Sequence, residues 1–102
     1  MSQRLFAVLR HQTGHFDHSR PLEEQREWSA HAAFMDNLAA AGFFLLVGPL
    51  DDGSHQVLLI VRADDADEVA RTMDPDPWTQ NGMLRTLWIA PWTLRIGALP
   101  GR

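Results

Sequence analysis

Continuous apolar runs mark three short segments in the first two thirds of the chain. Residues 4–11 contain the first run and predict a strand. Residues 43–47 and 57–61 form two further apolar runs, each short enough for a strand. The turn-forming segment Asp51-Asp52-Gly53-Ser54 separates them. We therefore expect these two strands to pair as an antiparallel hairpin.

A helical repeat of apolar positions runs from Leu22 to Ala41. Steps of three or four residues along this segment predict one apolar stripe on a helix. Pro21 is expected to open the helix, because proline is tolerated in a first turn, and Gly42 is expected to end it. The stripe consists of Trp28, His31, Met35, Leu38 and Gly42, flanked by Phe34 and Ala39.

The last third of the chain predicts a second helix followed by a strand. Asp64 is a candidate N-cap for this helix, which the segment Asp74-Pro75-Asp76-Pro77 is expected to end. A final strand is predicted from Met83 to about Ile96. Pro91 within it indicates an edge position or a bulge, because proline has no backbone N–H to donate.

The predicted order is strand, helix, strand, strand, helix, strand. With right-handed crossovers, this order predicts an α+β fold of the ferredoxin-like type, in which both helices cover one face of an antiparallel sheet. The length of 102 residues is typical of one domain, so we expect a single domain over residues 1–102.

The apolar runs carry apolar side chains on both faces of the predicted strands. A sheet with helices on one face usually alternates apolar and polar residues. Residues 43–47 and 57–61 do not alternate, so the uncovered face is expected to be apolar as well. Because a large exposed apolar patch usually marks an interface, we expect a homodimer in which two sheets pack face to face.

Composition removes several function classes. The chain has no lysine, cysteine or tyrosine, which excludes Schiff-base, thiol and phenolic chemistry of its own. A net charge of −4 with scattered arginines argues against nucleic-acid binding. No apolar run is long enough for a membrane helix, and no signal peptide or cofactor motif is visible, so we expect a cytoplasmic protein without a cofactor.

His31 is the most informative single residue, because it interrupts the apolar stripe of the first helix. The simplest interpretation is a core histidine bonded to one backbone carbonyl. The functional interpretation is a general acid or base, since imidazole titrates near neutral pH and a carboxylate tunes it readily. Asp76, beside the apolar Trp78, is a candidate for that carboxylate, although Asp-Pro pairs also simply end helices.

Two other groups of residues are candidates for binding. The spacing of His11, His15 and His18 is compatible with a divalent metal, although solvated loop histidines explain it equally. Arg10 and Arg62 lie near the ends of two strands expected to be parallel neighbours. Both would then lie at one end of the sheet, where they are candidates for contact with an anionic substrate.

Taken together, several motifs resemble the YciI-like (YCII-related) family over residues from about Arg4 to Leu99. The resemblance rests on the order and spacing of these motifs rather than on any one of them. They are Pro21-Leu22-Glu23-Glu24-Gln25, Trp28, His31-Ala32-Ala33-Phe34-Met35, Gly42, Gly48-Pro49-Leu50-Asp51-Asp52-Gly53, Asp76-Pro77-Trp78 leading to Gly82, and Pro91-Trp92.

This resemblance implies a dimeric α+β barrel with an active site built around a His–Asp pair. The matching residues here are His31 and Asp76, with Asp74 as the alternative carboxylate because an extra Asp-Pro pair precedes the motif. The interval to Gly82 favours Asp76. The residues that the resemblance and the sequence suggest as walls of the same cavity are Trp28, Met35, Pro49, Trp78 and Trp92.

The leading hypothesis is a small acid–base enzyme of isomerase, lyase or hydrolase type that acts on a small, aromatic-derived organic substrate. His31 would move a proton and Asp76 would hold its ring. The alternative is a non-enzymatic small-molecule-binding or accessory domain in which the same pair is structural. A metal-dependent version using the loop histidines is a third hypothesis.

Overall fold

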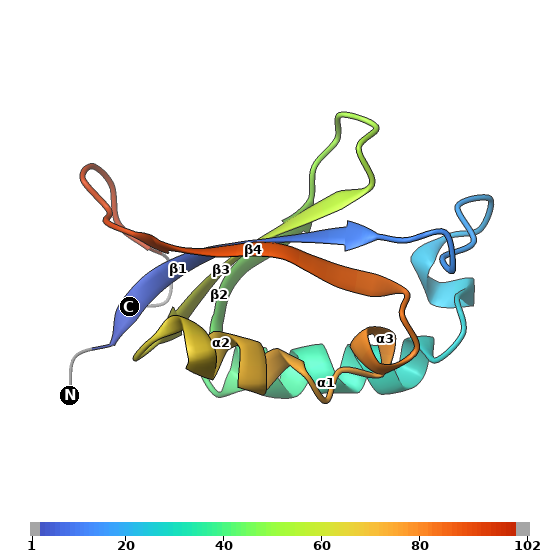
Figure 1. Ribbon diagram of the computed structural model, residues 1–102, viewed down its shortest axis with the longest axis horizontal. Helices are drawn as coiled ribbons and strands as arrows, with labels where there is room; N and C mark the ends of the chain where they lie inside the picture. Colours follow the sequence, from blue (N-terminus) through green and yellow to red (C-terminus); the bar gives the residue numbers. More distant parts are fainter. Residues whose placement is uncertain (1–2, 100–102) are drawn as a thin grey trace.

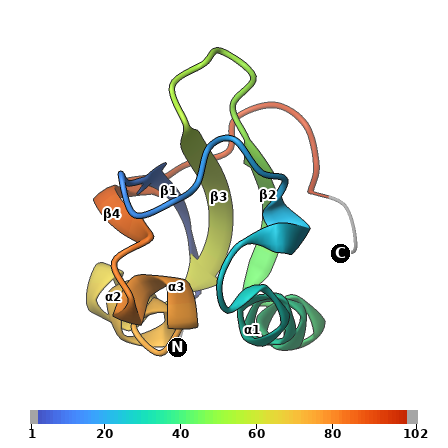
Figure 2. The same cartoon turned by 90° about the vertical axis from the view of Figure 1, so that its right-hand side faces the viewer.

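The computed structural model describes residues 3–99 as one antiparallel sheet with three α-helices beneath it (Figure 1). The four strands lie in the order β2-β3-β1-β4. In an end-on view, α1 lies below the β2 side of the sheet, and α2 and α3 lie below the β4 side (Figure 2). The predicted α+β class, an antiparallel sheet with its helices on one face, is therefore confirmed. The elements are β1 (Arg4–Gln12), the short 3-10 helix η1 (Leu22–Glu24), α1 (Trp28–Ala40), β2 (Phe44–Pro49), β3 (Gln56–Ala63), α2 (Ala66–Met73), α3 (Pro77–Gln80) and β4 (Leu84–Trp92).

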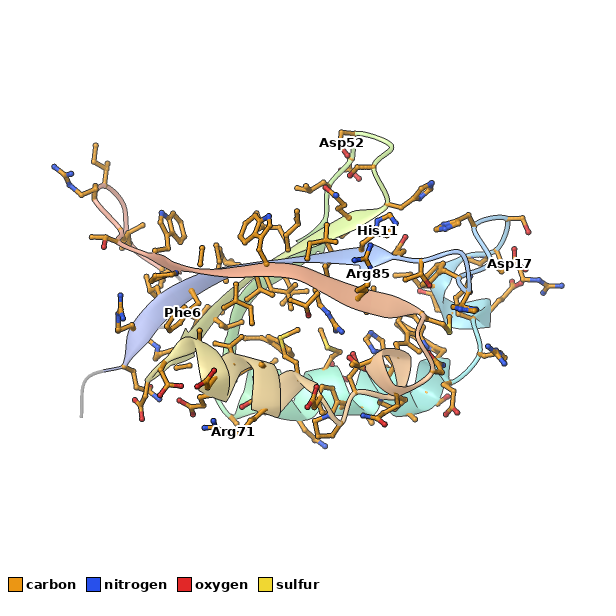
Figure 3. The ribbon with its side chains drawn as sticks, in the orientation of Figure 1. Phe6, His11, Asp17, Asp52, Arg71 and Arg85 are labelled. Carbon is orange, nitrogen blue, oxygen red and sulfur yellow. The ribbon has the colours of Figure 1, made fainter. Side chains whose placement is uncertain are left out.

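Alternate residues of the two central strands build the core between sheet and helices. Phe6 lies opposite Val61, and Val8 lies opposite Leu59, and all four are buried. Phe6 points into this layer, whereas Arg71 on α2 points away from it (Figure 3). Burial of such side chains drives the helices onto this face, at about 25 cal/mol for each Å² of apolar surface removed from water.

Strand β4 is an edge strand, as Pro91 indicated. Pro91 lies opposite Phe6, and the pairing ends where Trp92 meets Leu5. The predicted extension to Ile96 is wrong, because the pairing of β4 has by then reached the first residues of β1. The register shift in this pair lies at Leu9 and Arg10, not at Pro91.

Helix α1 begins six residues later than predicted. Pro21 starts only the single 3-10 turn η1, and Glu27 then takes a left-handed conformation with φ of 62°. A non-glycine residue in that conformation interrupts a helix, so α1 begins at Trp28. The predicted end is confirmed, since Gly42 has φ of 87° just after the helix. No helix among residues 3–99 combines the length and apolar character needed to cross a bilayer.

The segment around α2 differs from the prediction in two ways. Asp65 rather than Asp64 is the N-cap of α2, and its carboxylate accepts the backbone N–H of Glu68. The helix ends at Met73, as predicted. The proline-rich segment after it also opens a helix of its own, α3, because Asp76 caps its N-terminus and Pro77 takes the first helical position.

The sheet face opposite the helices is apolar, as predicted from the strands. Trp88 and Trp92 on β4 are 45% and 42% exposed, and Leu46 on β2 is 45% exposed. We call this the outer face. Its remaining apolar residues include Ala7, Leu58, Ile60 and Ala90.

Candidate active site

A cavity of about 260 Å³ lies at one end of the layer between the sheet and the helices. Most of its wall is apolar, and the chemistry-bearing side chains in the wall are Arg10, Gln12 and His31. The other lining residues are Leu22, Trp28, Met35, Val47, Gly48, Pro49, Val57, Leu59, Trp78 and Leu84.

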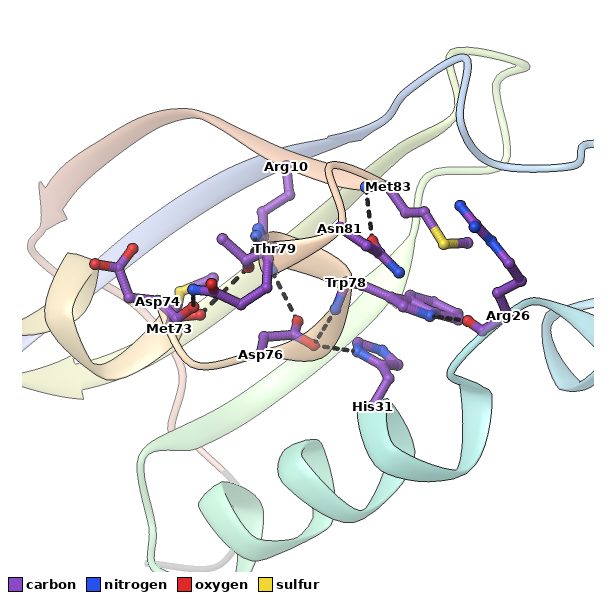
Figure 4. Close-up of polar contacts among 11 residues, drawn as sticks. Arg10, Arg26, His31, Met73, Asp74, Asp76, Trp78, Thr79, Asn81 and Met83 are labelled. Atoms are coloured by element: carbon purple, nitrogen blue, oxygen red, sulfur yellow. Dashed lines mark hydrogen bonds and ion pairs between the residues drawn. The ribbon is translucent and has the colours of Figure 1, made fainter.

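His31 lies in the first turns of α1 and is held by one carboxylate. Its Nδ1 lies 2.7 Å from Oδ1 of Asp76, and the histidine is only 7% exposed (Figure 4). The other ring nitrogen, Nε2, has no hydrogen bond to any described residue. Because His31 lines the cavity, its unbonded nitrogen is the group available to a bound molecule.

Asp76 is completely buried, and both of its carboxylate oxygens are used. Oδ1 accepts His31 and also the backbone N–H of Trp78 at 3.0 Å, while Oδ2 accepts Nη1 of Arg10 at 3.2 Å. Of the two candidate aspartates, Asp76 is therefore the one whose side chain contacts His31. Asp74 is exposed, and its backbone carbonyl accepts the side-chain amide of Gln80.

Arg10 is the third member of this group, and it is only 2% exposed. Its Nη2 donates to Oγ1 of Thr79 at 2.5 Å, and its Nε has no hydrogen-bond partner among the described residues. Burial lowers the pKa of the Arg10 guanidinium, and the adjacent Asp76 carboxylate opposes that effect. The guanidinium remains charged, because arginine stays protonated in proteins.

The sequence held a signal for the inward position of Arg10. Arg10 has the same parity along β1 as the buried Phe6 and Val8, so it points to the same face. The prediction that Arg62 joins it at one sheet end is wrong. Strands β1 and β3 are antiparallel, so Arg62 pairs with Leu5 at the opposite end of the sheet.

The indole of Trp78 stacks against the imidazole ring of His31. The ring of His31 stacks on the indole with centroids 3.8 Å apart and planes inclined by 8°. The indole N–H of Trp78 donates to the backbone carbonyl of Arg26 at 2.6 Å, which fixes the indole in turn. Trp28 packs beside both rings, with centroids 5.9 Å from Trp78 and 6.1 Å from His31.

The structure brings most of the predicted site residues to this one cavity. Asp76 is not in the cavity wall but bonds to His31, and Trp92 lies away from the cavity. Trp92 lies on the outer face, because residues that alternate along β4 point to opposite sides of the sheet. The prediction that Trp92 lines the cavity is therefore wrong within one chain. The predicted residues that do line it are Arg10, Trp28, His31, Met35, Pro49 and Trp78.

Sequence reasoning missed Thr79, which binds Arg10, and Leu22, which lines the cavity from η1. A threonine in a short helix carries no distinctive pattern, so no signal marked it. The apolar periodicity places Leu22 in a longer helix, whereas it lies in the short 3-10 helix η1.

The loop histidines do not form a metal site in the part of the chain that the structure describes. No group of three histidine or carboxylate ligands occurs there. His18 instead stacks on Phe16 and lies against His55, with ring centroids 5.3 and 4.0 Å away.

The arrangement is suited to moving a proton. A carboxylate is an acceptor, so Asp76 favours a proton on Nδ1 of neutral His31 and leaves a lone pair on Nε2. That lone pair can accept a proton from a bound molecule, and the resulting imidazolium can return it. Most of the surrounding wall is apolar, so few other groups compete for that proton.

The fold is similar to a solved structure of 5-chloro-2-hydroxyhydroquinone dehydrochlorinase from Burkholderia phenoliruptrix AC1100, in complex with 2,5-dihydroxybenzoquinone. The TM-score is 0.64 at 24% sequence identity, and the match covers 87% of this chain and 93% of that one. This likeness shows the fold. A search of curated proteins finds no match. The model of the YCII-related domain matches residues 5–93, so the chain belongs to the YCII-related family.

Proposed function

We propose that this protein is a small acid–base enzyme in which His31 transfers a proton on a small organic substrate. The observation that carries the proposal is the 2.7 Å contact between His31 and the buried Asp76 at the wall of an apolar cavity. A hydrogen-bonded base whose second nitrogen borders an otherwise apolar pocket is the usual arrangement for this chemistry.

Asp76 has two tasks in this mechanism. Its carboxylate holds the proton of His31 on Nδ1, which directs the lone pair of Nε2 away from Asp76. When Nε2 takes a proton from the substrate, the same carboxylate stabilises the imidazolium that forms. Return of the proton to another atom completes an isomerisation, and loss of a leaving group completes an elimination.

The cavity favours a small, flat substrate. Its volume of about 260 Å³ lies just below the usual range of ligand pockets, about 300–1,000 Å³. Trp28 and Trp78 offer aromatic faces, and Met35 and Pro49 add apolar contacts. Such walls suit an aromatic or quinone-like ring better than a charged metabolite. The dehydrochlorinase of similar fold, whose ligand is a dihydroxybenzoquinone, supports this choice of substrate class.

A screen of small hydroxylated aromatic compounds, quinones and lactones tests the proposal. Turnover is followed by ultraviolet absorbance with the wild-type protein. We expect His31→Gln to reduce the rate of the active compound by about 10²–10⁴-fold, the usual contribution of a general acid–base group. His15→Gln is the matched control, because His15 is exposed and lies outside the cavity. Full activity of His31→Gln would refute the assignment.

The same panel separates an enzyme from a binding domain. A compound that binds with unchanged affinity to His31→Gln and is never converted by the wild type would favour the non-enzymatic alternative. In that case the His31–Asp76 contact would serve stability alone.

We also propose that a second copy of the chain covers the outer face. Trp88, Trp92 and Leu46 expose more than two fifths of their surface there. Large apolar side chains gathered on one sheet face usually mark an interface. The homodimer is thus proposed from the apolar face and from the fold group to which the chain is similar.

A further inference from the structure

The guanidinium of Arg10 contacts Asp76 on the side away from His31. Arg10 donates to Oδ2, while His31 contacts Oδ1, so one carboxylate lies between a permanent cation and an imidazole. Asp76 is 0% exposed and Arg10 is 2% exposed. Water therefore screens the Asp76 carboxylate and the Arg10 guanidinium only weakly, so these two opposite charges must balance each other.

Charge balance decides which form of His31 fits this site. Arg10 and Asp76 together are neutral, so a neutral imidazole leaves the group with no net charge. A protonated His31 would add one positive charge beside two groups that are almost completely buried. Among the described residues, the titratable side chains that contact His31 or line its cavity are Arg10 and Asp76. Asp74 also acts electrostatically on the Arg10 guanidinium, but it is exposed, so water screens its charge more than that of Asp76.

The position of Arg10 is itself fixed. Its second terminal nitrogen donates to Oγ1 of Thr79, and that hydroxyl in turn donates to the backbone carbonyl of Met73 at 3.3 Å. Thr79 lies in α3, the helix that Asp76 caps. The guanidinium thus connects β1 to both the capping residue and the body of α3, which leaves it little freedom to turn towards a ligand.

We infer that Arg10 is a positioning residue that balances the charge of Asp76 and so keeps His31 as a neutral base with its proton on Nδ1. This inference rests on the proposed function for its use in catalysis. It assigns Arg10 this role through its bonds to Asp76 and Thr79, while contact between Arg10 and an anionic substrate stays a separate prediction.

The inference is tested by nitrogen NMR of the histidine rings in ¹⁵N-histidine-labelled protein without substrate. His31→Gln identifies the His31 signals by their loss. At neutral pH, the wild-type ring is expected to be neutral and protonated on Nδ1. Arg10→Gln keeps a donor for Asp76 but removes the charge, so the protonated fraction of His31 is expected to increase. Arg10→Lys keeps the charge and should restore the wild-type pattern.

Arg85→Gln is the control for loss of a positive charge as such, because Arg85 is exposed on β4. An Arg10→Gln protein that is folded and shows the wild-type His31 signals would overturn the inference. If Arg10→Gln does not fold, the spectra of the wild type and of Arg10→Lys still test the inference. A His31 ring that is an imidazolium, or a neutral ring protonated on Nε2, in either of these two proteins would contradict the inference. The spectra need no substrate, so this result is independent of whether the enzymatic proposal holds.

Discussion

The imidazole of His31 lies flat on the indole of Trp78, with ring centroids 3.8 Å apart. Asp76 binds an edge of the same imidazole through Nδ1. One contact therefore fixes the plane of the ring and the other fixes its rotation within that plane. Both come from neighbouring residues of one proline-stiffened segment, so the histidine is oriented by a single rigid element.

Trp78→Phe should keep an aromatic face beneath His31 but lose the hydrogen bond from the indole to Arg26. We expect a loss of about 1 kcal/mol in the free energy of unfolding for that bond, with a further cost for the smaller ring. Urea denaturation measures it. Ile96→Ala is the control, because Ile96 is 92% exposed, and an equal loss in both variants would contradict the prediction.

Asp76→Asn should destabilise the protein by about 3–5 kcal/mol, because it leaves the buried Arg10 guanidinium without its counter-charge. Asp74→Asn tests the neighbouring carboxylate in the same segment. Asp74 is exposed, so a change of less than about 0.5 kcal/mol is expected. Chemical denaturation of the two variants distinguishes them, and similar midpoints would show that the buried pair contributes little.

Asp65→Ala should cost about 1 kcal/mol, since Asp65 is the N-cap of α2 and accepts the N–H of Glu68. Asp64→Ala provides the matched control. Only the backbone N–H of Asp64 takes part in the local bonding, where it donates to the side chain of Glu68, and alanine retains it. Thermal unfolding of both variants compares the two positions. A larger effect at Asp64 would place the cap where the sequence alone had suggested.

Trp88→Glu should convert the proposed homodimer into a monomer, because it places a charge in the apolar outer face. Sedimentation velocity at micromolar concentration measures the change. Ser29→Glu introduces the same charge on an exposed position of α1 and should leave the sedimentation unchanged. A wild-type protein that sediments as a monomer would remove the dimer proposal altogether.

The sequence predicted those helix and strand boundaries that are set by residues at the boundary itself, such as turn formers and helix-ending glycines. The hairpin between β2 and β3 follows from its turn residues, and the end of α1 follows from Gly42, whose left-handed φ suits glycine. The start of α1 was missed because the buried amide of Gln25 organises the preceding loop. It bonds backbone groups of Asp17 and Arg20, a set of contacts that no helical periodicity reveals.

The candidate site was predictable only where each residue carried its own signal. His31 was conspicuous because it interrupts an apolar stripe, and Asp76 because it precedes a stiff Pro-Trp pair. The role of Arg10 depends on its distance to a carboxylate 66 positions away, which spacing does not encode. Trp92 was misplaced because a motif gives the order of residues but not the side of the sheet on which each one lies.

The three groups of the site come from three separate parts of the chain. Arg10 belongs to the first strand, His31 to the first crossover and Asp76 to the second, and 45 residues separate the last two. Contacts over such sequence distances form only after the intervening loops have closed. The His31–Asp76 bond therefore joins the two halves of the domain, and neither half can carry a working site before the other has docked. Assembly of the proposed catalytic group and completion of the fold are therefore expected to be one event.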